Sequence, residues 1–314
     1  MPAVTSNIVP LRHARPGVVA YVKSPADWFV ANSGWIQGTD GVVLIDTCGT
    51  EQATLELLRD VRKYAGDQEL TVVITHAHGE RHNGLGVALR EGGTALAAPG
   101  SVEAVKAGPQ TYGNVFTYTR WGVLEPPEPD AVRPVAGWRR LDLGGAAADV
   151  VAVPGVAHTA GDLVVYEPRS GTLFTGDLVF VGSTPMAVHG SVPGWLEALD
   201  WLQDTFRPRT LVPGHGPVAT PGHTAVHGMR VYLEWLLEVT ARQTDFTKLA
   251  HQASLRWPTW RNPERHIGNL MRAYADQHHR KLDVDLAIDA VLAAAGGRID
   301  LDCLLDGEPV RRIS

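Results

Sequence analysis

The stretch Thr71–Gly84, TVVITHAHGERHNG, decides how the rest of the chain is interpreted. Its first five residues, TVVIT, form a β-branched run of the kind that a buried strand uses. Four polar side chains follow at every second position: His76, His78, Glu80 and His82. While a chain stays extended, alternate side chains lie on one side of it, so these groups would face a common point. Imidazole nitrogens and carboxylate oxygens suit zinc, iron or manganese, and the pattern therefore predicts a metal site.

Chance is the alternative explanation for such a cluster. With 13 histidines in 314 residues, an HxH pair arises by luck in roughly every second chain of this size. Requiring an acid and another histidine at the next two alternate positions lowers that frequency to roughly a few in a thousand. A surface cluster of histidines would also not normally follow a buried strand. The metal site is the favoured interpretation.

The composition is that of a globular protein that can bury a large core. Apolar residues make up 44% of the 314 residues and charged residues 20%, which predicts one large domain or one domain with an appendage. The net charge of −6 disfavours sequence-independent nucleic-acid binding, which needs a basic face, and also disfavours an anionic membrane surface. No run approaches the ~18 apolar residues of a membrane span.

The cysteines and the first residues suggest a compartment. Cys48 and Cys303 are far apart and not in CxxC spacing, so no disulfide framework is expected and a reducing compartment is the default. Residues 1–19 lack the apolar core of a signal peptide. We therefore expect a cytoplasmic protein that acts on a small molecule, without nucleic-acid or membrane partners; a homodimer is left open.

Strands and helices alternate through the first two thirds of the chain. Thr50 is a candidate N-cap for the first helix and Gly66 its stop signal. Strands are expected within residues 17–47 and at 71–75, 94–99, 148–153, 162–168, 171–177 and 210–217. Helices are expected at 51–64, at about 82–90 and around 195–206. This alternation predicts an α/β fold.

Two regions depart from the alternation. Residues 106–140 are rich in glycine and proline and contain five aromatic residues between Tyr112 and Trp138, which predicts a long loop. That loop is either a functional lid or a surface excursion held by its own aromatics. From residue 221 onward helical patterns predominate. We therefore expect a body over residues 1–220 and a helical extension over residues 221–314 that packs on it.

Aromatic residues before and within the long loop are candidate walls of a substrate pocket. They are Trp28, Trp35, Tyr112, Phe116, Tyr118 and Trp121. Aromatic walls suit an apolar or ring-containing substrate. The alternative for each of them is burial in the core.

Three further ligand candidates lie where predicted strands end. His158 occurs in AVPGVAHTAGD, Asp177 in LFTGDLVF and His215 in LVPGHGP. Each is weak evidence alone, because a single loop histidine is more often exposed or used in a structural hydrogen bond. Their repetition matters: four strand ends, each followed by a glycine-containing turn, present a residue type that binds metals.

Together these motifs resemble those of the metallo-β-lactamase superfamily. The hallmarks of that family are HxHxDH, (A/G)HTxGD, xxGD and PGHG, and this chain has HAHGERH, AHTAGD, FTGD and PGHG in the same order. The resemblance covers roughly residues 17–220. It implies a four-layer αββα sandwich with a C-terminal helical extension and metals in a groove at one edge of the two sheets. It also implies that Asp46, in GVVLIDT, braces the ligands from behind.

The resemblance assigns the ligands residue by residue. The first metal would be held by His76, His78 and His158, and the second by Glu80 and His215, with Asp177 between or beside both. One or two divalent ions are implied, with zinc expected and iron or manganese as alternatives.

Two residues depart from the family pattern. Glu80 stands where the family has aspartate, and Arg81 stands where the hydrolases usually have histidine. The second metal thereby loses a nitrogen ligand. His82 could replace that ligand; alternatively, it touches substrate or packs at the start of a helix.

The expected function is that of a metallo-hydrolase. A metal-bound hydroxide would cleave an ester, lactone, thioester or amide of a small apolar or ring-containing substrate. Asp177 would orient the nucleophile, and Glu80 and Arg81 are further catalytic candidates. Arg81 would bind a substrate carboxylate or, alternatively, form a structural salt bridge. The rival hypotheses are a non-haem iron oxygenase or sulfur-handling enzyme on the same fold, and a degenerate metal-binding protein.

Overall fold

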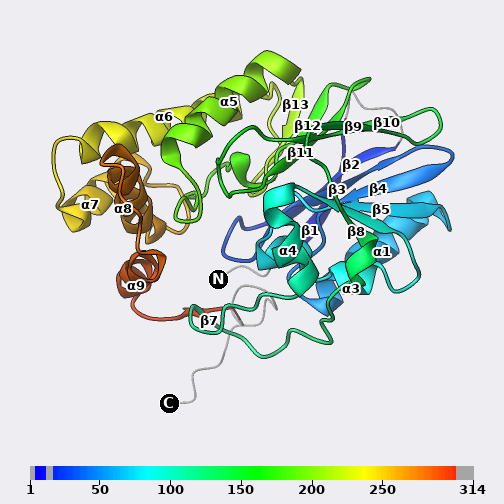
Figure 1. Ribbon diagram of the computed structural model, residues 1–314, viewed down its shortest axis with the longest axis horizontal. Coiled ribbons are helices and arrows are strands. Elements are labelled where there is room, and N and C mark those ends of the chain that lie inside the picture. The colour runs from blue at the N-terminus through cyan, green and yellow to red at the C-terminus, as the bar shows by residue number, and fades with distance from the viewer. Residues whose placement is uncertain (1–3, 12–16, 302–314) are drawn as a thin grey trace.

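Two β-sheets pack face to face at the centre of the computed structural model, which describes residues 4–11 and 17–301 (Figure 1). Within those residues the larger sheet has seven strands in the order β1-β2-β3-β4-β5-β6-β8, and the smaller sheet has five in the order β13-β12-β11-β10-β9. The larger sheet consists of Thr5–Pro10 (β1), Val18–Ser24 (β2), Ser33–Gln37 (β3), Gly41–Ile45 (β4), Glu69–Val73 (β5), Thr94–Ala97 (β6) and Val132–Pro134 (β8). The smaller sheet consists of Trp138–Asp142 (β9), Ala147–Ala152 (β10), Leu163–Glu167 (β11), Thr172–Phe174 (β12) and Thr210–Val212 (β13).

The alternation of side chains along each strand separates the apolar cores. In β4, Val43 and Ile45 belong to the core between the two sheets, where Phe174 of β12 also lies. Val42 and Leu44 point to the opposite face and join the core beneath the helices of the larger sheet. Because neighbouring side chains of a strand lie on opposite faces, the continuous apolar run GVVLI is buried on both sides.

Helices cover the outer face of each sheet. Those on the larger sheet are Glu51–Ala65 (α1), Gly79–His82 (α2), Leu85–Ala88 (α3) and Pro99–Ala107 (α4). Helix α1 has the predicted cap, because the Thr50 hydroxyl accepts a hydrogen bond from the amide of Ala53 at 3.2 Å and Gly66 follows the last turn. The smaller sheet is covered by Val192–Phe206 (α5) and then by the C-terminal helices (Figure 1).

The C-terminal helices are His223–Thr240 (α6), Phe246–Arg256 (α7), Arg265–Gln277 (α8) and Val284–Ala295 (α9). The first three share one apolar core with the outer face of the smaller sheet, whereas α9 packs in a separate cluster with the end of α8. Leu233 of α6, Leu249 of α7 and Leu270 of α8 lie in the same cluster as Trp195 of α5. The predicted αββα sandwich with a C-terminal helical extension is therefore confirmed, while the domain boundary at residue 220 stays a prediction.

The segment 106–140 is not one continuous loop, and this expectation was wrong. Its second half contributes a short 3₁₀ turn (Pro129–Ala131) and then β8 and part of β9, which enter the two sheets. Its first half contains Phe116–Thr117 (β7), which pairs in parallel with Ile299–Asp300 (β14). Strands this short carry no periodic signal among the glycines and prolines. The aromatic segment is thus fixed to the end of the helical extension.

Two further observations concern partners and redox state. In the part of the chain that the structure describes, none of the helices combines the length and the apolar character needed to cross a bilayer. Cys48 is a buried free thiol, and Cys303 lies outside the described residues.

Candidate metal centre

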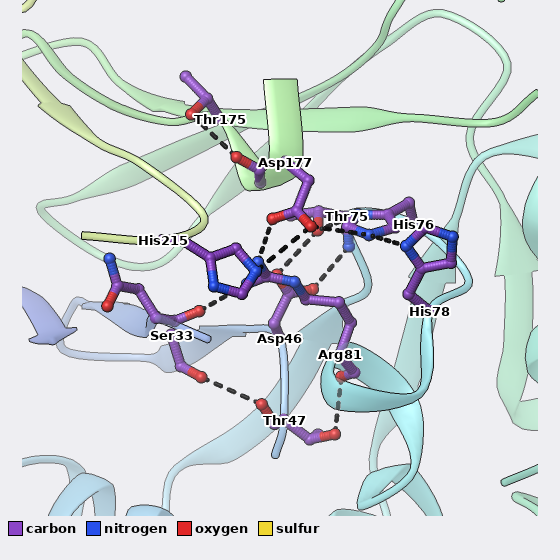
Figure 2. A network of polar contacts seen from close by, with 12 residues as sticks. Ser33, Asp46, Thr47, Thr75, His76, His78, Arg81, Thr175, Asp177 and His215 are labelled. Carbon is purple, nitrogen blue, oxygen red and sulfur yellow. Dashed lines mark hydrogen bonds and ion pairs between the residues drawn. The ribbon is translucent and has the colours of Figure 1, made fainter. Parts of the chain in front are cut away.

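The site forms where strands of both sheets end. His76 follows β5, His158 follows β10, Asp177 follows β12 and His215 follows β13. β12 and β13 are parallel to each other. β10 runs in the same direction as β12, because both β10 and β12 are antiparallel to β11. The ends of these strands therefore meet at one edge of the sandwich, and the loops after them point their side chains at each other (Figure 2).

Three imidazoles and one carboxylate converge in the first group, formed by His76, His78, His158 and Asp177. Nε2 of His76 lies 3.1 Å from Nδ1 of His78, and that Nδ1 lies 3.2 Å from Nε2 of His158. Oδ2 of Asp177 lies 3.6 Å from Nε2 of His76 and 3.6 Å from Nε2 of His158. Ligands bonded at 2.0–2.1 Å to a tetrahedral zinc ion stand roughly 3.3–3.4 Å apart. The spacing of these atoms therefore fits a tetrahedral zinc ion.

A second group consists of Glu80, Asp177 and His215. Oδ2 of Asp177 lies 3.5 Å from Nε2 of His215. The ring of His215 stacks on Phe180 with centroids 4.8 Å apart and an interplanar angle of 6°, which fixes its orientation. Asp177 therefore belongs to both candidate ligand groups.

Burial sets the charge of the ligand side chains. It lowers the pKa of His158 to about 4 and lowers the pKa values of His76 and His78 well below the usual value, so all three imidazoles are neutral at pH 7. Burial alone would raise the pKa of Asp177, but the Arg81 guanidinium beside it, together with His215 and His76, holds that pKa well below its usual range. Neutral imidazoles around an ionised carboxylate are the protonation states that bind a divalent cation.

Arg81 lies behind the ligands and does not line the pocket, which corrects its predicted catalytic role (Figure 2). Its guanidinium is fully buried, bonds to Oδ1 of Asp177, and donates from Nη1 to the Asn32 carbonyl at 2.8 Å. Nη1 also lies 3.3 Å from Oδ2 of Asp46. A side chain enclosed in this way cannot reach a substrate. The alternative of a structural salt bridge describes Arg81, which occupies one oxygen of Asp177 and leaves the other to face the histidines.

Asp46 lies behind the candidate ligands, as the sequence predicted, and contacts Thr75, the residue before His76. Its carboxylate accepts hydrogen bonds from the amide and the hydroxyl of Thr75 at 2.7 and 2.8 Å. The Thr75 hydroxyl also lies 3.1 Å from Nδ1 of His76. Burial is the main cause that raises the pKa of Asp46, to about 6, although Arg81 acts to lower it. These contacts connect Asp46 to the orientation of a ligand imidazole.

His82 does not join either ligand group, contrary to one of its predicted uses. The prediction assumed that the chain stays extended to residue 82, but α2 begins at Gly79. Two residues along a helix turn a side chain by roughly 200°, so His82 points away from the side that Glu80 presents. It is 2% exposed, and within the described residues neither of its ring nitrogens has a hydrogen-bond partner. Packing at the helix is the use that this position fits.

The pocket in front of the ligands is lined mainly by aromatic and aliphatic side chains. Of the predicted walls, Trp28, Tyr112 and Phe116 line it. Tyr118 and Trp121 do not; their rings pack on each other at 4.7 Å, and Trp121 packs on Phe29, itself a wall, at 5.3 Å.

Trp35 was also predicted as a wall, and this was wrong. It is 0% exposed and lies beneath α1, with its ring 5.5 Å from that of Tyr64. The strand that carries it is buried on both faces, and Trp35 points to the helix-covered face.

The family model described as metallo-beta-lactamase superfamily matches residues 26–215, which include both ligand groups. The chain belongs to the metallo-beta-lactamase superfamily. The match ends before α6, so the helical extension lies outside the part that the superfamily model covers.

Similar proteins agree with membership in the superfamily. A metallo-beta-lactamase type 2 of Bacillus sp. (strain 170) is 28% identical over 204 residues, which cover 62% of this chain and 70% of the relative. The solved metallo-beta-lactamase from Pontibacter korlensis has a TM-score of 0.57 and 20% identity, covering 73% of this chain and 99% of its own. The solved metallo-beta-lactamase from Hirschia baltica has a TM-score of 0.54 and 19% identity, and the match covers 73% of this chain and 97% of that protein. At these identities the solved structures show a shared fold.

Three polar residues at the site of this superfamily member escaped the sequence analysis. Nδ1 of His189 lies 3.0 Å from Nε2 of His78, on the opposite side of the ring from the other ligands. Asp162 accepts hydrogen bonds from the amide and hydroxyl of Thr159 at 2.9 and 2.7 Å and so holds the loop that carries His158. Arg265 lines the pocket from α8. Asp162 ends the AHTAGD motif and could have been found there, whereas the other two stand in no motif.

Proposed function

We propose that this protein is a zinc-dependent hydrolase with two metal ions that cleaves an ester, lactone, thioester or amide bond of a small, largely apolar substrate. Membership in the superfamily and the His/Asp cluster support a metal-dependent hydrolase. One observation carries the proposal: a single carboxylate oxygen, Oδ2 of Asp177, faces Nε2 of three histidines at 3.5–3.6 Å. Those distances are longer than ordinary N–H···O hydrogen bonds and leave space for cations between the groups.

The donor set supports zinc in particular. Three neutral imidazoles with one carboxylate are a nitrogen-rich set that suits zinc, and the spacing in the first group matches its tetrahedral geometry. A divalent ion, when bound, supplies a water of lowered pKa and polarises the bond to be cleaved. Glu80 and His215 complete a second set around the shared Asp177, which supports two ions rather than one.

The protein's own residues prepare the site for this chemistry. Arg81 fixes Asp177 through its Oδ1 atom, so Oδ2 keeps its direction toward the histidines. His189 fixes the ring of His78 from the side opposite the ligands. The aromatic walls exclude water and give an apolar substrate its contact area. The unpaired, buried Cys48 supports a reducing, cytoplasmic compartment as part of the proposal.

Metal content and activity test the proposal together. Elemental analysis of the purified protein should give zinc near two equivalents, and chelation should abolish hydrolysis of 4-nitrophenyl esters until zinc is restored. His76→Ala and Asp177→Ala should each lose metal and turnover while the fold, followed by circular dichroism, is retained. The matched control is His223→Ala at the exposed start of α6, which should retain both.

Specific outcomes would contradict the proposal. Full activity after complete metal removal would exclude a metal-dependent hydrolase. Iron in place of zinc, with activity that disappears under nitrogen, would favour the iron oxygenase instead. A protein that neither retains metal nor responds to its addition would favour the degenerate binding protein.

A further inference from the structure

Arg265, the first residue of α8, is a buried cation without a counter-ion. Its side chain is 3% exposed, and among the described residues no carboxylate forms a salt bridge with it. Nη1 donates to the Thr184 carbonyl at 2.9 Å. Within that same part of the chain, Nε has no hydrogen-bond partner. Burial lowers the pKa of this guanidinium, yet an arginine stays charged at any physiological pH.

The two carboxylates that act most strongly on the Arg265 charge, Asp27 and Glu264, bond to other groups. Asp27 bonds to Arg261 and accepts a hydrogen bond from Asn262 at 2.5 Å. Glu264 accepts a hydrogen bond from the indole nitrogen of Trp28 at 2.6 Å. The indole ring of the same Trp28 lies under the Arg265 guanidinium, 3.7 Å from its central carbon. Trp28 therefore holds the guanidinium flat from one side without neutralising it.

Arg265 faces the same pocket as the metal ligands. His78, Glu80, Asp177 and His215 line this pocket, and so does Arg265, with Trp28 and Phe116 among the apolar walls between them. Burying an unpaired ion destabilises a folded protein, and strongly perturbed charged groups in clefts mark functional sites. A ligand that brings a negative charge into the pocket would remove that penalty when it binds.

We propose that Arg265 binds a carboxylate of the substrate, so that the substrate is a small carboxylic acid with an apolar body and a second, hydrolysable group. The inference deepens the proposed function, on which it rests, because the hydrolysable group would lie at the metal centre. A carboxylate matches the planar donor face of a guanidinium that is already stacked on Trp28. The apolar walls would bind the body of the ligand through dispersion contacts and burial, without further ion pairs.

The position of Arg265 shows that the helical extension contributes to the pocket as well as to the fold. The superfamily match ends at residue 215, whereas Arg265 begins α8 and Ile288 of α9 lines the same pocket. The extension thus completes the substrate pocket with a charge and an apolar wall. The extension therefore selects the substrate in addition to packing on the metal-binding body.

Binding can be tested without turnover by titrating the protein with phenylacetate and with its neutral isostere phenylacetamide, using calorimetry. We expect wild-type protein to bind phenylacetate at least about tenfold more tightly, as a buried charged hydrogen bond predicts. Arg265→Gln should bring the affinity ratio close to one, and Arg265→Lys should keep part of it. The matched control is Arg256→Gln, which removes an exposed guanidinium stacked on Trp257 at 5.2 Å outside the pocket; it should leave the ratio unchanged.

Metal-loaded and metal-stripped protein distinguish the two sites where a carboxylate could bind. If Arg265 is the site, the preference for phenylacetate persists after stripping and is lost in Arg265→Gln. If the metals are the site, the preference disappears on stripping and survives Arg265→Gln, and the proposal is overturned. Equal affinities of the wild type for both compounds would also overturn it. Thermal unfolding of each variant verifies its fold, and Arg265→Met offers a second replacement if glutamine is not tolerated.

A kinetic arm connects the inference to catalysis. The mono-4-nitrophenyl ester of adipic acid and the corresponding 4-nitrophenyl methyl adipate differ only in the free carboxylate. The ratio of their kcat/KM values should favour the acid in wild type and fall about tenfold or more in Arg265→Gln, mainly through KM. An unchanged ratio contradicts the assignment. Failure of wild type to hydrolyse either ester would instead count against the proposed function, while the binding preference for phenylacetate would still stand or fall by itself.

Discussion

Replacing Arg81 by methionine should destabilise the protein strongly, and more so without metal. The guanidinium is 0% exposed and is the partner of two carboxylates, Asp177 and Asp46, that are themselves buried. Methionine keeps the volume but leaves both carboxylates without their cation. Breaking a buried ion pair from one side costs about 3–5 kcal/mol, against a total stability of about 5–15 kcal/mol for a typical protein. Divalent ions bound to Asp177 would replace part of the lost charge, so the loss should be smaller in metal-loaded protein.

Urea unfolding followed by tryptophan fluorescence measures this loss in both metal states. The control is Arg242→Met, which removes an exposed i,i+4 pair with Glu238 at 3.2 Å and should change the stability by about 0.5 kcal/mol or less. A double variant adds Asp46→Asn to Arg81→Met, removing one of the stranded charges, and should recover part of the loss. If Arg81→Met cost no more than the control, or if Asp46→Asn gave no recovery, the account of Arg81 as the cation that neutralises the base of the site would be refuted.

Three further predictions concern pH, backbone space and the second metal. Burial lowers the pKa of His266 to about 4, below its unfolded value of about 6.5. The stability that the neutral imidazole contributes is therefore present above pH 6.5 and is lost as the pH falls toward 4. In urea unfolding, the wild type should lose about 2 kcal/mol more than His266→Phe between pH 7.5 and pH 5. Equal losses would contradict this. Gly214→Ala would place a Cβ in contact with Oδ1 of Asp177 and should lower activity at least about tenfold, whereas Gly228→Ala on α6, with open space around it, should retain activity. Glu80→Gln should reduce bound metal from two equivalents toward one, and two retained equivalents would exclude Glu80 as a ligand of the second ion.

The convergence of the candidate metal ligands could be predicted because their evidence is local. His158, Asp177 and His215 each follow a short apolar run that becomes a strand, and the carboxyl ends of such strands meet at one edge. Each ligand lies in a glycine-containing turn whose sequence is distinctive. His82 shows where local evidence fails, since the alternation that predicted it as a ligand ends when the chain becomes helical at Gly79.

The pocket could be predicted only in part, because its walls depend on contacts between distant segments. Trp35 and Trp28 are both aromatic residues near β3, and the sequence does not say which of them faces a helix and which faces the pocket. Arg265 follows Trp28 by more than two hundred residues and stacks on it all the same. A polar residue at the start of a helix ordinarily indicates a solvent-exposed position. Its burial here is a property of the tertiary structure.

The charges around the site connect metal binding with the choice of substrate. Glu80 and Asp177 line the pocket beside Arg265, and both act to raise the pKa of its guanidinium, so they stabilise its positive charge while no cation lies between them. Divalent ions bound to these carboxylates would cancel that stabilisation, so Arg265 would bind an anion more tightly. By linkage, a carboxylate bound at Arg265 should then strengthen metal retention to the same degree that metal strengthens carboxylate binding. Slower loss of zinc to a chelator with phenylacetate present, but not with phenylacetamide, is the expected result; an equal rate with both compounds would show that the two sites are independent.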